Sequence, residues 1–105
     1  MSTLSDKEKQ NYLNQLFEFL ELPSISADSR YKETMEQTAK WLSNQLIKSG
    51  CDSSKIYSTN GHPIVYGEKI IDESMPTILV YGHYDVQPPD PIELWTNHPF
   101  KPIIK

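Results

Sequence analysis

Apolar side chains recur with the period of an α-helix near the start of the chain. They make one face between positions 12 and 20, at Tyr12, Leu13, Leu16, Phe17 and Leu20. This spacing predicts a helix from about Ser5 to about Leu22. Ser5 and Glu8 have the spacing of a capping box, and Pro23 stops the helix.

A second helical stripe follows a predicted loop over residues 23–29. Its members are Met35, Thr38, Ala39, Leu42 and Leu46. They predict a helix over about residues 30–49, capped by Asp28 or Ser29 and ended by Gly50 in the left-handed conformation. Amphipathic helices of this kind usually pack on a core, so we expect both stripes to be core faces.

Strand-like segments follow the helices. Residues 54–58 and 63–69 flank Asn60-Gly61, a strong hairpin signal, and predict a pair of strands. Residues 77–82 are almost continuously apolar, which predicts a third strand buried on both faces in a parallel arrangement. The predicted fold class is therefore α/β, with two helices packed on a partial mixed sheet.

Composition narrows the class of protein. The chain has 105 residues, of which 23% are charged and 37% hydrophobic, with a net charge of −4. These values predict one soluble globular domain, and no basic stripe indicates a nucleic-acid partner. No apolar run is long enough for a membrane span or a signal peptide, so a cytoplasmic location is expected. The single cysteine, Cys51, excludes an internal disulfide.

The predicted third strand runs into Gly-His-x-Asp, the strongest candidate for chemistry. Gly82 is expected to allow a tight turn that leaves His83 at the strand's C-terminal end, where open α/β sheets keep ligand sites. Asp85, two residues on, lies on the same side of an extended segment. Its carboxylate can then bond one imidazole nitrogen and leave the other for a metal. His-x-Asp is also a common triplet, so a structural histidine is the alternative.

Other candidate ligands are weaker. His62 is expected to be a solvated turn residue, His98 a structural loop residue, and Cys51 a thiol without a ligand partner. A zinc site needs three or four ligands, and His83 is the only good one. An enzyme would therefore need more chain than this.

At this point the pattern resembles a known family. The run Leu79-Val-Tyr-Gly-His83-Tyr-Asp85-Val-Gln-Pro88, then Trp95 and Pro99-Phe100, resembles the di-zinc metallopeptidases. That family includes aminoacylases, carnosine-type dipeptidases, acetylornithine deacetylase and succinyl-diaminopimelate desuccinylase. Residues 19–27 and 31–46 resemble the family's first-helix end and following helix. The resemblance covers about residues 8–105, and residues 86–89 with 93–95 favour the dipeptidase-like branch.

The resemblance implies a role for two residues. His83 would bind zinc, and Asp85 would be the active-site acid that orients it. Residues 1–105 would be the N-terminal segment of the catalytic domain. The other ligands, the general-base glutamate and a dimerisation domain would follow Lys105. The complete enzyme would be a homodimer that hydrolyses dipeptides or N-acyl amino acids with a water bridged by two zinc ions, with cobalt or manganese as alternative metals. The segment alone would be inactive.

Three alternatives remain open. The protein is a deacetylase or desuccinylase of the same family, a relative that lost its later ligands and acts as a scaffold, or a small α/β interaction module in which His-x-Asp is coincidental. In each case the segment 77–82 expects a neighbour on both sides. An open apolar edge there predicts self-association or marginal stability of the chain.

Overall fold

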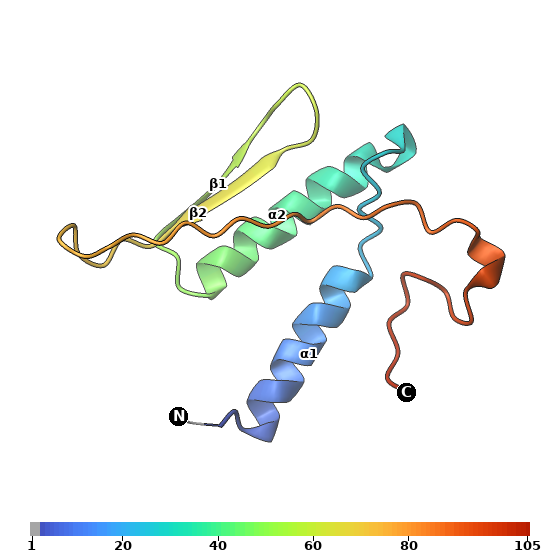
Figure 1. The fold of residues 1–105 in the computed structure, drawn as a ribbon, viewed down its shortest axis with the longest axis horizontal. Helices are drawn as coiled ribbons and strands as arrows, with labels where there is room; N and C mark the ends of the chain where they lie inside the picture. Colours follow the sequence, from blue (N-terminus) through green and yellow to red (C-terminus); the bar gives the residue numbers. More distant parts are fainter. Residues whose placement is uncertain (1–2) are drawn as a thin grey trace. The chain divides into compact units, whose positions relative to one another are not determined.

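A computed structural model describes residues 3–105 of the chain. It divides into two compact units, one formed by Ser24–Gln87 and the other by the segments up to Pro23 and from Pro88 onward. The elements in chain order are α1 (Asp6–Leu20), the 3-10 turn η1 (Ser29–Tyr31), α2 (Lys32–Lys48), β1 (Ser53–Tyr57), β2 (Ile64–Glu68) and the 3-10 turn η2 (Ile92–Leu94) (Figure 1).

Helix α1 begins at the predicted capping box. The backbone N–H of Glu8 donates to Ser5 Oγ at 3.2 Å, and the backbone N–H of Ser5 donates to Glu8 Oε2 at 2.7 Å. The hydrogen bonds that the backbone N–H and the hydroxyl of Ser5 donate to the Glu8 carboxylate hold the pKa of this carboxyl below its ordinary value. Because the pKa of Glu8 is lower in the folded chain, the cap adds its full contribution to the free energy of unfolding above the ordinary pKa of the carboxyl. This contribution is lost as the pH falls through the lowered pKa.

The apolar stripe of α1 is not a buried face. None of the helix residues is buried, and Tyr12 and Leu16 expose 55% and 50% of their surface. The prediction of a core face is therefore wrong for α1 in the part of the chain that the structure describes. The stripe reports the helical period correctly, but burial also needs a partner surface, which the period does not encode.

Helix α2 begins two residues later than predicted. Asp28 caps the 3-10 turn η1, its carboxylate accepting from the backbone N–H of Arg30 at 2.9 Å, and the α-helix starts only after this turn. At the other end, Gly50 has the positive φ of 109° expected of a residue that ends a helix. The predicted stripe is confirmed as a core face, since Met35, Thr38 and Ala39 are buried.

The two predicted strands pair as an antiparallel hairpin, with a register from Ser53 opposite Glu68 to Tyr57 opposite Ile64. Helix α2 lies along the hairpin and packs against both strands (Figure 1). Ser43 Oγ of α2 and Ser54 Oγ of β1 are 2.8 Å apart, and a Cβ at Gly67 would lie 2.9 Å from Leu46 Cδ1. Glycine at position 67 therefore lets the helix approach β2 closely.

The fold class is confirmed as α/β, but the third strand is not formed. Among the described residues, the segment 77–82 has no strand partner, and Gly82 makes neither a turn nor a positive φ. Four consecutive apolar side chains on this segment are 85–90% exposed: Ile78, Leu79, Val80 and Tyr81. The apolar run is typical of a buried strand, but a strand also needs a neighbour for its backbone, and the sheet here ends after two strands.

We expect the exposed segment to make the chain self-associate. Large exposed apolar runs associate because burial removes their surface from water. Val80→Lys should shift the chain towards monomer by placing a charge in the middle of the run. Light scattering over a concentration series measures this shift.

The matched control is Ile71→Lys, which changes another exposed isoleucine, 77% exposed, outside the run. A wild-type chain that stays monomeric and monodisperse at all concentrations contradicts the prediction.

Neither helix of the described residues is long and apolar enough to cross a membrane.

Candidate metal centre

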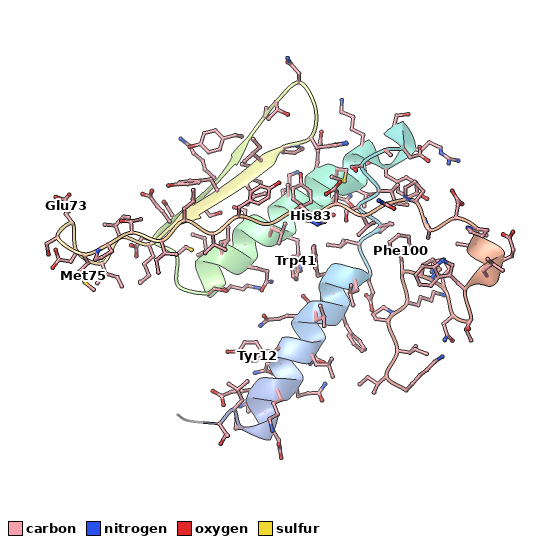
Figure 2. All side chains as sticks on the ribbon, viewed as in Figure 1. Tyr12, Trp41, Glu73, Met75, His83 and Phe100 are labelled. Atoms are coloured by element: carbon pink, nitrogen blue, oxygen red, sulfur yellow. The ribbon has the colours of Figure 1, made fainter. Side chains whose placement is uncertain are left out.

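His83 lies on the extended segment that follows the sheet (Figure 2). Its Nδ1 is 3.0 Å from Asp85 Oδ1 and 3.1 Å from the backbone oxygen of Asp85. Both oxygens only accept, so Nδ1 must carry the proton. In the neutral ring the lone pair is then on Nε2. The side chain is 75% exposed, so this nitrogen is accessible to a metal ion.

A second hydrogen bond holds the other oxygen of the Asp85 carboxylate, Oδ2. Ser26 Oγ donates a hydrogen bond to Asp85 Oδ2 at 2.6 Å, so each carboxylate oxygen has its own donor. The hydrogen bond from Ser26, followed by that from His83, holds the pKa of the Asp85 carboxyl below its ordinary value, while partial burial opposes the shift. Asp85 is therefore a carboxylate at neutral pH, the form that accepts both bonds.

Backbone contacts fix the loop that carries Ser26. Ser24 Oγ donates to the Tyr84 carbonyl at 2.7 Å, and the Val86 N–H donates to the Ser24 carbonyl at 2.9 Å. Ile25 and Val86 form an isolated parallel bridge, with Ser24 and Ile25 only 2% and 3% exposed. The segment 84–86 is thus held against residues 24–26, which the sequence predicted only as a loop.

His62 corrects a second prediction. It is half-buried, and its Nε2 lies 2.8 Å from the carbonyl oxygen of Ser26, to which it donates. The Tyr84 hydroxyl donates to the Pro63 carbonyl at 2.6 Å, and burial raises the pKa of Tyr84. The hairpin turn therefore closes onto the loop beside Asp85, and His62 is not a solvated residue. No local sequence signal indicated this contact, because the partners are 36 positions apart.

The other candidates have local surroundings of their own. His98 Nδ1 accepts a hydrogen bond from the backbone N–H of Phe100, a local structural role. Cys51 is a free thiol. Within residues 3–105, no group of three histidine, cysteine or acidic residues is arranged to hold a metal ion. His83 with Asp85 therefore offers one oriented ligand, and the donor set of a complete site is not present in this part of the chain.

Comparisons with known proteins find metallodipeptidases among the relatives of the chain. The chain is 30% identical over 111 residues to the Cys-Gly metallodipeptidase DUG1 of Saccharomyces cerevisiae, covering 94% of the chain. Its fold matches a solved structure of the dipeptidase Dug1p from Saccharomyces cerevisiae with a TM-score of 0.84 and 32% identity over 95% of the chain. The resemblance to the metallopeptidase family is confirmed.

A second solved structure extends the family match beyond yeast. The M20 family metallo-carboxypeptidase Sso-CP2 from Sulfolobus solfataricus matches with a TM-score of 0.78 and 38% identity over 97% of the chain. No protein-family model matches the chain. The chain spans about a fifth of its relatives, 23% of DUG1 and 21% of the carboxypeptidase. Its similarity to this family is therefore a similarity to part of a catalytic protein.

Proposed function

We propose that residues 1–105 form the N-terminal segment of the catalytic domain of a metal-dependent dipeptidase. The observation that carries the proposal is the pair His83–Asp85, in which the carboxylate fixes the Nδ1 proton and leaves Nε2 accessible. The match to metallodipeptidases over most of the chain supports it. The remaining ligands and the general base come from other parts of the complete enzyme, which we propose to be a homodimer of the cytoplasm.

His83 acts in this proposal as a neutral metal ligand. Its ring is oriented by the hydrogen bond to Asp85, which also raises the basicity of the ligating nitrogen. A divalent metal ion bound there would polarise the scissile carbonyl and lower the pKa of a water molecule. An imidazole ligand suits zinc, and we propose two zinc ions, with cobalt and manganese as alternatives.

The proposed substrate is a short peptide. The relative DUG1 is a Cys-Gly metallodipeptidase, so Cys-Gly is the first substrate to test. N-acyl amino acids are the competing class, because a deacetylase or desuccinylase would use the same metal chemistry on a different acyl group.

Metal removal tests the proposal on the complete enzyme. Cys-Gly hydrolysis, measured as release of free glycine, should be lost on dialysis against a chelator and restored by zinc. Cobalt and manganese are compared in the same assay, and the 105-residue chain alone is the inactive control, because it offers one ligand. Hydrolysis that survives complete metal removal, or that acts on N-acetyl and N-succinyl amino acids but not on Cys-Gly, contradicts the proposal.

A further inference from the structure

We propose that Ser26 is a positioning residue for this site, which holds the Asp85 carboxylate so that Oδ1 faces His83 Nδ1. The inference rests on the proposed function and deepens it. Ser26 would touch neither substrate nor metal. It would act through Asp85 and fix which nitrogen of His83 carries the proton.

Each oxygen of the Asp85 carboxylate accepts a hydrogen bond from a different side chain. Oδ2 accepts from Ser26 Oγ at 2.6 Å, and Oδ1 accepts from His83 Nδ1 at 3.0 Å. The terminal torsion of an aspartate is broad, so a carboxylate held by one donor can still rotate. A donor on each oxygen defines its plane. Each bond has the length usual for its donor, O–H···O from Ser26 and N–H···O from His83, so both oxygens are held.

The backbone that carries the hydroxyl is itself fixed on both flanks. On one side, Ile25 is buried and bridges to Val86, next to the paired Ser24. On the other, the carbonyl of Ser26 accepts from His62 Nε2 at 2.8 Å. The hydroxyl is thus placed before any ligand arrives, which is the arrangement that a precise metal or catalytic site requires.

A merely structural role for Ser26 makes a different prediction. Segment 84–86 is already tied to the loop by the bonds of Ser24 to Tyr84 and Val86. Loss of the Ser26 hydroxyl should therefore leave this connection in place. If Ser26 only joined the two segments, its removal would lower stability without changing the tautomer of His83.

The test is long-range proton–nitrogen NMR of the histidine rings in the metal-free 105-residue chain. The spectra are recorded at about pH 8, and the nitrogen shifts of each neutral ring report which nitrogen carries the proton. We expect wild-type His83 to show a protonated Nδ1 and an unprotonated Nε2. In Ser26→Ala we expect a mixture in which part of the rings carry the proton on Nε2. Nδ1 stays the favoured site, because the backbone oxygen of Asp85, 3.1 Å away, still accepts from it. Ser26→Thr keeps the hydroxyl and should restore the wild-type pattern.

Ser43→Ala is the matched control, because it removes another serine hydroxyl bond, the 2.8 Å contact with Ser54 in the same compact unit. It should leave His83 unchanged. The Val86 amide signal checks that segment 84–86 is still bound to the loop. If Ser26→Ala does not fold, Ser26→Cys replaces it, with a weaker donor of similar shape and the same expected direction.

An unchanged His83 spectrum in the folded Ala or Cys variant overturns the inference. A wild-type chain in which Nε2 carries the proton overturns it as well. Neither readout needs bound metal or activity. An enzyme that proves independent of metal would therefore contradict the proposed function while leaving this test of Ser26 to be decided on its own spectra.

Discussion

We expect Met35→Ala to lower the free energy of unfolding of the unit Ser24–Gln87 by about 2–5 kcal/mol. Met35 is 1% exposed and lies on α2 beside Thr38 and Ala39, both fully buried. Truncation removes buried apolar surface and leaves a cavity that a small core cannot refill. Since a domain is stable by about 5–15 kcal/mol, this loss is a large part of the total. Urea unfolding, followed by the amide signals of α2, measures it.

Met75→Ala is the control for methionine chemistry, because Met75 lies in the same unit and is 54% exposed. Its effect should stay within about 0.5 kcal/mol. Met35→Leu keeps the volume and should cost less than about 1.5 kcal/mol. Equal losses at positions 35 and 75 would show that Met35 is not the centre of the core.

Local sequence signals predicted local structure well. The capping box at Ser5 and the left-handed Gly50 each depend on residues a few positions apart, and the structure contains both. The hairpin around Asn60-Gly61 is also formed, but its connection runs from Tyr57 to Ile64 and neither residue of the pair has the positive φ of a two-residue Asn-Gly turn. The start of α2 was missed by two residues, because Asp28 caps a 3-10 turn before the α-helix begins. The competing turn uses the same side-chain chemistry as a helix cap, so the sequence does not separate them.

Signals of burial were less reliable than signals of period. The stripe of α1 and the run 78–81 both have the apolar character of core residues, yet both are exposed here. An apolar side chain is stabilised by burial, but it is buried only where another surface of the protein covers it. The stripe of α2 is buried because the hairpin covers it, at a distance set partly by the missing side chain of Gly67.

The candidate site shows the same division. The contact of His83 with Asp85 was predicted because residues two apart in an extended segment share a side, and the two atoms are within hydrogen-bonding distance. Ser26 was not predicted as part of the site. It lies 59 positions from Asp85, in a segment with no periodic pattern, and only the folded loop brings its hydroxyl to the carboxylate.

Substitutions in the pair are expected to have graded effects on the complete enzyme. His83→Ala removes the ligating nitrogen and should abolish Cys-Gly hydrolysis. Asp85→Ala should lower activity or metal affinity by about 10–100-fold. The loss is partial because the backbone oxygen of residue 85 remains, 3.1 Å from His83 Nδ1, and still favours the required tautomer. Metal content after dialysis and hydrolysis rates measure both effects.

One further variant, Asp85→Asn, separates charge from geometry at position 85. Asp85→Asn keeps an oxygen for His83 and an amide for Ser26 Oγ, so it should lose less than Asp85→Ala if orientation dominates. It should lose as much if the negative charge dominates. Glu73→Ala, at an exposed acid of the same unit, is the control and should keep full activity. Wild-type rates and metal content in Asp85→Ala would remove Asp85 from the site, and the orientation of His83 would then rest on the backbone oxygen alone.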